Sequence, residues 1–275
     1  GFKDGFLVRG MPLIQTHPGK VFWVGNAAAA KFAEHKSASN GNQGTFNDPF
    51  STLDYAFGRC TASRNDIIMI KPGHAETIST ATAMAWDVAG VAIIGLGVGS
   101  LRPTFTLDTA NTATITVSVA NVSVQNCIFI ANFLDIATCF TVTTAKDFSV
   151  ELCEFRDTSS VLNFINIVDT NASANDADGL YIANCRIQSL GTTAATSVID
   201  VDAALDRLVL KDNFYVGAVL NNTPAWVDAA TFALTNVEIA RNKTYRINTD
   251  TATGGLIVAG SSTGNTGMAY ENYSR

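Results

Sequence analysis

The feature that most constrains the fold is a short segment that recurs through the second half of the chain. It follows the pattern x-Φ-x-Φ-x-x-(Cys/Asn), where Φ is apolar, and clear copies begin at positions 121, 147, 179, 207 and 236. Their seventh positions are Cys127, Cys153, Cys185, Asn213 and Asn242, which lie 26, 32, 28 and 29 residues apart. Weaker copies occur near Val91 and Met268. Repetition with such a period is typical of a solenoid.

Each copy has apolar residues at alternate positions, as in Val122 and Val124. This alternation predicts an extended strand with one buried face. A second apolar strand lies between copies, as in Phe164–Val168 and Val198–Val201, and turn residues join the two without a helical period. Leucine-rich repeats are disfavoured because their period is shorter. We therefore predict an all-β chain, a single-stranded right-handed parallel β-helix of roughly eight coils.

Stacked coils place like residues above one another, so the seventh positions should form columns along the axis. Cys127, Cys153 and Cys185 would make one column of buried thiols. Asn213 and Asn242, with Asn126 and Asn184 one position earlier, would bond along the stack as an asparagine ladder.

The first 49 residues lack the repeat, which divides the chain into an arm and entry segment (1–49) and a β-helix (50–275) that begins with a capping helix (50–60). In that helix we expect Ser51 as N-cap and Asp54 at N3, with an apolar face of Leu53, Ala56, Phe57 and Cys60. A cap is needed because open strand edges promote aggregation.

Residues 1–18 are predicted to be an extended arm that binds a partner subunit. Apolar side chains outside the repeat have no place in the core, so a neighbouring chain is a plausible host. These side chains are Phe2, Phe6, Leu7, Val8, Met11, Leu13 and Ile14.

Composition narrows the functional classes. The chain has 275 residues and a formal charge of −6, with no cluster of Lys or Arg, so we do not expect it to bind nucleic acid. Its apolar stretches are too short to span a membrane. The five cysteines have no metal-ligand spacing, so we expect neither a metal nor another cofactor.

Three strings near the start of the repeat region resemble the entry of pectin-lyase-like β-helix proteins. They begin at Gly19, Gly44 and Asp66, and the last contains Pro-Gly-His-Ala-Glu-Thr. The resemblance implies either a polysaccharide lyase or hydrolase, often a trimeric tailspike, or a non-catalytic bacteriophage virion protein. It indicates a fold and not an activity.

The best candidate catalytic pair is Asp200 and Asp202. Because Ile199 and Val201 would point inward, both carboxylates can project from one strand face, about 7 Å apart. That separation suits an inverting glycosidase. We expect a plain solvated face instead, because no His or further acidic pair recurs at the equivalent places one coil up or down, which Phe164–Val168 and Ala225–Val227 occupy. The later aromatic residues are scattered, which does not favour a sugar-binding groove.

Other motifs give weaker signals. The segment 169–179 has oxygen ligands at alternate positions but lacks the Gly and Glu of a calcium loop, so an Asx-rich turn is the simpler interpretation. His74 follows the turn at Lys71 and is expected to stabilise it.

We therefore expect a structural virion protein and not an enzyme. It would be a homotrimeric capsid decoration or fibre, assembled in the bacterial cytoplasm and attached through its arm to a major capsid or tail protein. The alternative is a tailspike-like polysaccharide depolymerase, a glycoside hydrolase or lyase that binds cell-surface polysaccharide and uses Asp200 and Asp202.

Overall fold

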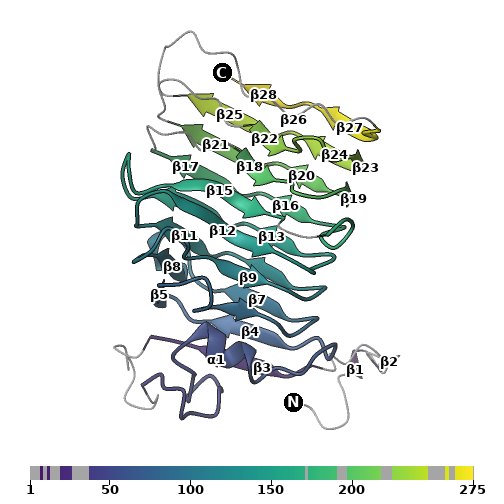
Figure 1. Cartoon of the computed structure of the whole chain (residues 1–275). Helices are drawn as coiled ribbons and strands as arrows, with labels where there is room; N and C mark the ends of the chain where they lie inside the picture. The colour runs from purple at the N-terminus through teal and green to yellow at the C-terminus, as the bar shows by residue number, and fades with distance from the viewer. Residues whose placement is uncertain are drawn as a thin grey trace.

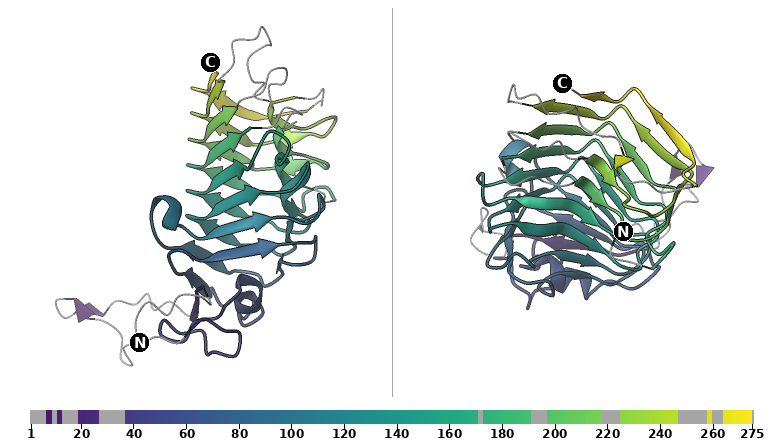
Figure 2. Two further views of the ribbon diagram at one scale, coloured as in Figure 1. Left: turned by 90° about the vertical axis from the view of Figure 1, so that its left-hand side faces the viewer. Right: turned by 45° about the horizontal axis from the view of Figure 1, so that its top comes forward.

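The computed structural model of the chain describes residues 7–8, 11–12, 19–26, 37–170, 173–190, 197–217, 225–246, 258–259 and 264–274. It confirms the predicted fold class, a right-handed parallel β-helix. Successive coils add strands to three parallel sheets, and the coils stack along one axis (Figures 1 and 2). Seven coils contribute a described strand to all three sheets, close to the predicted number.

Sheet 1 has nine strands. In spatial order these are β3 (Val21–Val24), β4 (Ile67–Ile70), β7 (Ala92–Gly95), β10 (Ser123–Gln125), β13 (Ser149–Glu151), β16 (Tyr181–Ala183), β20 (Val209–Lys211), β24 (Val237–Ala240) and β27 (Gly267–Tyr270). The recurring segment of the sequence supplies the strands from β10 to β24. Their register places Val124 beside Val150 and Ile182 beside Leu210, as the alignment of copies predicts.

Sheets 2 and 3 have eight and seven strands. Sheet 2 contains β5 (Ala75–Ile78), β8 (Thr104–Leu107), β11 (Ile128–Ala131), β14 (Glu154–Asp157), β17 (Arg186–Ser189), β21 (Phe214–Gly217), β25 (Lys243–Arg246) and β28 (Tyr273–Ser274). Sheet 3 contains β6 (Ala85–Trp86), β9 (Ile115–Val117), β12 (Ile136–Val142), β15 (Phe164–Asp169), β18 (Ser197–Asp200), β22 (Ala225–Asp228) and β26 (Val258–Ala259).

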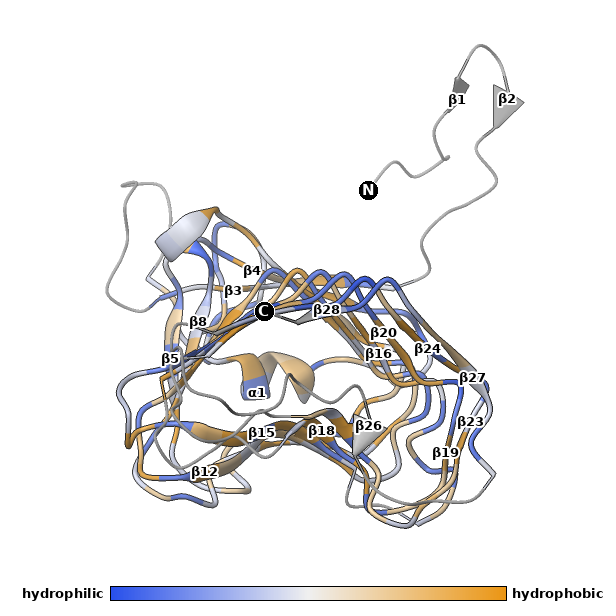
Figure 3. Ribbon diagram, turned by 90° about the horizontal axis from the view of Figure 1, so that it is seen from above, coloured by the Kyte–Doolittle hydropathy of each residue, from blue (hydrophilic) through white to orange (hydrophobic). Residues whose placement is uncertain are grey.

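Seen along the axis, sheets 1 and 3 face each other across the core, and sheet 2 closes one side (Figure 3). A short pair, β19 (Leu205–Asp206) and β23 (Leu234–Thr235), lies on the other side. Inward-facing residues of the same type stack on one another in consecutive coils. Phe105, Phe129 and Phe155 come from consecutive coils of sheet 2, with ring centroids 5.6 and 5.4 Å apart.

The corner between sheets 1 and 2 is made by one left-handed residue in each of the last six coils. Its φ lies between 53° and 58° at Asn126, Leu152, Asn184, Asp212, Arg241 and Glu271. Asn and Asp adopt this conformation more readily than other side chains do. Asn126 bonds to the carbonyls of Gly95 and Gly97 in the preceding coil, whereas Asn184 is exposed.

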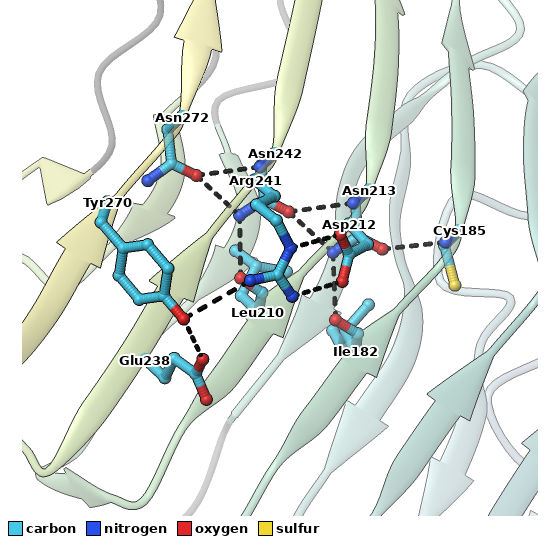
Figure 4. A network of polar contacts seen from close by, with 10 residues as sticks. All are labelled: Ile182, Cys185, Leu210, Asp212, Asn213, Glu238, Arg241, Asn242, Tyr270 and Asn272. Carbon is cyan, nitrogen blue, oxygen red and sulfur yellow. Dashed lines mark hydrogen bonds and ion pairs between the residues drawn. The ribbon is translucent and has the colours of Figure 1, made fainter.

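The predicted ladder lies one residue beyond this corner and extends further than the sequence indicated. Asn213 Nδ2 donates to Asn242 Oδ1 at 2.9 Å, and Asn242 Nδ2 donates to Asn272 Oδ1 at 3.0 Å (Figure 4). Each amide also accepts from the backbone N–H one coil below, so that Asn213 Oδ1 reaches the N–H of Cys185. Below it, Cys127, Cys153 and Cys185 form the buried column of free thiols.

The N-terminal end of the core is covered by α1 (Leu53–Phe57), which lies within the outline of the coils (Figure 3). Its residues Leu53, Ala56 and Phe57 are buried, as predicted. The predicted N-cap is wrong: Thr52 caps the helix and accepts from the N–H of Tyr55 at 3.4 Å. The Ser51 hydroxyl instead donates to Asn40 Oδ1.

The entry segment already belongs to the stack, because β3 pairs with β4. Of the predicted arm, only β1 (Leu7–Val8) and β2 (Met11–Pro12) are described, as an antiparallel pair. The side chains proposed to bind a partner (Phe2, Phe6, Leu7, Val8, Met11, Leu13 and Ile14) lie outside the described part of the chain.

Candidate functional site

An acidic row crosses the outer face of sheet 3 where three consecutive strands end. The final residues of β15, β18 and β22 are Asp169, Asp200 and Asp228, and the pairing register aligns each with the next. All three are half-buried. The residues just before them, Val168, Ile199 and Val227, are fully buried in the core. The alternation of a strand therefore directs the three aspartates outward.

No further acidic pair was expected beside Asp200, and the structure places a single aspartate on each side of it, Asp169 and Asp228. The sequence does carry a signal for this row, since the three strands end in Ile-Val-Asp, Val-Ile-Asp and Trp-Val-Asp. The pair Asp200 and Asp202 is brought together as predicted, with Val201 buried between them. Asp202 is exposed, and its backbone N–H donates to Thr170 Oγ1 at 3.3 Å.

A buried amide supports Asp200 from the preceding coil. Asn166 is 8% exposed and donates through Nδ2 to Asp200 Oδ2 at 3.1 Å. Ser197 in turn donates to Asn166 Oδ1 at 3.1 Å, which fixes the amide orientation. The Asp200 side chain is therefore positioned by hydrogen bonds that join two coils.

The surroundings of Asp200 favour its protonated form. Burial raises the pKa of Asp200, and the negative charges of Asp202 and Asp228 raise it further. The hydrogen bond from Asn166 opposes this shift without cancelling it. A carboxyl whose pKa is raised, with other carboxyl groups beside it, can serve as a general acid.

The spacing of the row suits the cleavage of glycosidic bonds. Consecutive coils are about 4.8 Å apart, near the 5–5.5 Å that separates the carboxyl groups of retaining glycosidases. Two coils span about 9.6 Å, just beyond the range of about 6.5–9.5 Å for inverting enzymes. The register continues the row as Thr116, Thr141, Asp169, Asp200, Asp228 and Ala259. None of these six positions is Lys or Arg.

The exposed aromatic residues are less scattered than the sequence suggested. Phe214 and Tyr245 are 36% and 47% exposed on neighbouring strands of sheet 2. Tyr215 and Trp226 are instead buried in the core.

His74 and the segment 169–179, the other candidates from the sequence, make contacts that stabilise the fold. His74 is buried, and its Nε2 lies 3.1 Å from Glu76 Oε2, which also accepts from the N–H of Leu53 at the start of α1. In the segment 169–179, Asp178 accepts from the N–H of Asp206 at 2.9 Å. Among the residues that the structure describes, no group of three or more His, Cys, Asp or Glu is placed to hold a metal ion. No helix in the described ranges is long and apolar enough to cross a bilayer.

Comparison with known proteins is informative at the level of fold. Among solved structures, the chain is similar to a rhamnogalacturonan lyase, with a TM-score of 0.52 and 14% identity over 90% of this chain. It spans 63% of the length of that lyase chain. A pectate lyase, Pel9A, is also similar, with a TM-score of 0.40 and 12% identity over 92% of this chain and 79% of the other. No protein family and no curated protein sequence matches the chain. The chain therefore has the pectin-lyase-like β-helix fold, and its function has to be argued from its own residues.

Proposed function

We propose that this chain is a polysaccharide depolymerase of the tailspike-like kind, which hydrolyses glycosidic bonds at the acidic row of sheet 3. The observation that carries the proposal is the position of Asp200, a carboxyl with a raised pKa between Asp169 and Asp228 and close to Asp202. Protonation of the leaving oxygen by one carboxyl, while a second activates water or attacks the sugar, is the standard chemistry of such a pair.

The surroundings divide the roles. Asp200 is the general acid, because burial and the charges of Asp202 and Asp228 raise its pKa. Asp202 is the proposed base, because it is exposed to the water that must be activated. Asn166 positions Asp200 and does not itself act on the substrate.

The test is hydrolysis of purified neutral polysaccharides from bacterial surfaces, measured as new reducing ends. Replacing Asp200 by Asn keeps the shape and removes the proton, so Asp200→Asn is expected to lower the rate by about 10²- to 10⁴-fold. The matched control is Asp87→Asn, an exposed aspartate directly after β6 of the same sheet, which should leave the rate unchanged.

Two results would overturn the proposal. One is cleavage by Asp200→Asn at the wild-type rate, and the other is failure of the wild-type chain to cleave any polysaccharide of the panel. An unsaturated product would show elimination and contradict hydrolysis.

A second candidate is the non-catalytic virion protein expected from the sequence, a homotrimeric capsid decoration or fibre. Exposed apolar side chains favour subunit contacts. Leu134 and Val161 are 52% and 49% exposed on neighbouring loops, which are joined by the bridge between Leu134 and Leu162. This candidate predicts stoichiometric copies on virus particles and loss of attachment when residues 1–18 are deleted. Attachment of the truncated chain would contradict the proposed role of the arm.

A further inference from the structure

A second outward-facing row lies on sheet 2, away from the acidic row. The register aligns Arg186 of β17, Phe214 of β21, Lys243 of β25 and Tyr273 of β28, so that cationic and aromatic side chains alternate along the axis. Tyr245 lies two residues beyond Lys243 and therefore on the same face. We call these five residues the sheet 2 track.

The track faces solvent. Phe214, Tyr245 and Tyr273 are 36%, 47% and 57% exposed, and Arg186 is exposed. The residues that alternate with them, Ile187, Tyr215 and Thr244, are buried. The aromatic rings of the track are thus not part of the core, and their burial by a ligand would be favourable.

The two cations of the track are not used in ion pairs. In the described part of the chain, Glu154 holds both Arg102 and Arg156, and Asp212 holds Arg241 (Figure 4). Neither Arg186 nor Lys243 makes an ion pair with another described residue. The Arg186 guanidinium instead lies 5.9 Å from the centre of the Phe214 ring. Unpaired cations on a chain with a net charge of −6 are a site of local attraction for anions.

The surface beside the track is hollowed in two places. A hollow of about 380 Å³ is lined by Arg186 together with Asn184, Leu152 and Val98. A second, of about 580 Å³, is lined by Phe214 and Lys243 with Asp212, Arg241 and Glu271. Leu152 adopts a left-handed conformation at φ 54° and is 53% exposed at the corner that borders the first hollow. The hollows offer amide and apolar contacts next to the cations. They are also lined by the carboxylates of Glu154, Asp212 and Glu271, of which Glu154 and Asp212 are paired with arginines.

We propose that the sheet 2 track binds a linear polysaccharide that carries carboxylate groups. A polymer of acidic sugars offers both features that the track repeats: carboxylates for Arg186 and Lys243, and flat ring faces for Phe214, Tyr245 and Tyr273. The acidic row of sheet 3 would repel such a polyanion. The track is therefore an attachment site separate from the hydrolytic site, and its binding does not depend on the proposed function.

The experiment measures binding of the intact chain to alginate, a polymer of uronic acids, by titration calorimetry at low and moderate salt. The double variant Arg186→Ala/Lys243→Ala should raise Kd by about 10- to 100-fold, on the basis of roughly tenfold for each lost charge-assisted contact. Phe214→Ala/Tyr245→Ala should weaken binding at all salt concentrations. The control, Arg59→Ala, removes an exposed arginine at the capped end and should bind like wild type.

The proposal is overturned if the wild-type chain fails to bind alginate, or if the double charge variant binds as tightly as wild type. Equal affinity for neutral dextran would show that carboxylates are not recognised. Tighter binding of single-stranded poly(dT) than of alginate would assign the track to nucleic acid instead. Because the readout is binding alone, loss of hydrolysis in Asp200→Asn leaves this result unaffected.

Discussion

The raised pKa of Asp200 suits its proposed role as a general acid but lowers the stability of the folded chain at neutral pH. Its pKa is raised in the folded state by burial and by Asp202 and Asp228. A raised pKa means that the folded state binds a proton more tightly than the unfolded chain does. The protonated Asp200 carboxyl therefore stabilises the folded state. This stabilisation is fully present at pH values below the pKa of Asp200 in the unfolded chain, and it is lost as the pH rises through the pKa in the folded state.

Asp200→Asn is therefore expected to raise the melting temperature at pH 7 while it removes activity. The gain should vanish below the ordinary Asp pKa of about 3.9, where the wild-type carboxyl is protonated in both states. Thermal unfolding at both pH values measures this difference. Destabilisation of Asp200→Asn at pH 7, with Asp87→Asn unchanged, would contradict the described environment.

The sequence allowed the prediction of two residues of the site but not of the whole row. Ile199 and Val201 fix the direction of Asp200 and Asp202 by simple alternation. Asp169 and Asp228 were missed because the interval between copies varies from 26 to 32 residues, and loops of different length hide the register of the second strand. Only the pairing of β15, β18 and β22 shows that the three aspartates are neighbours.

At the scale of elements, the asparagine ladder joins the last coils. Asn242 accepts from the N–H and the Nδ2 of Asn213, and its own Nδ2 donates to Asn272 and to the carbonyl of Leu210. It is fully buried. Removing its side chain leaves several buried polar groups without partners, each of which costs about 1–3 kcal/mol.

We predict that Asn242→Ala lowers the free energy of unfolding by about 3 kcal/mol or more. Chemical denaturation of the intact chain measures the loss. The comparison is Asn184→Gly, at an exposed left-handed corner position that glycine tolerates, which should change stability by less than about 1 kcal/mol. If the two substitutions lower the free energy of unfolding by the same amount, the hydrogen bonds of the ladder do not contribute the predicted stability.

The cap shows where reasoning from local sequence fails. The pattern correctly predicts a helix that buries Leu53, Ala56 and Phe57, but the helix spans Leu53–Phe57 and not 50–60, and Thr52 is its N-cap. Ser51 is occupied by Asn40, and the N–H of Leu53 is bound by Glu76. Both partners come from segments more than ten residues away, which a helix-capping rule cannot take into account.

At the scale of the whole molecule, the solenoid presents two faces of opposite character. Sheet 3 carries Asp169, Asp200 and Asp228, and sheet 2 carries Arg186 and Lys243 between aromatic rings. The stacking of coils produces both rows, because a residue type repeated at one position of the coil becomes a line along the axis. The fold is similar to that of a rhamnogalacturonan lyase, and the proposals for this chain are argued from these two rows.

The most direct test of this account measures cleavage of a neutral polysaccharide and binding of alginate for the same set of variants. The account predicts that Asp200→Asn loses cleavage and keeps alginate binding, whereas Arg186→Ala/Lys243→Ala loses binding and keeps cleavage. If either variant loses both cleavage and alginate binding, the two faces do not act independently. If both variants keep cleavage and binding, neither row has the proposed role.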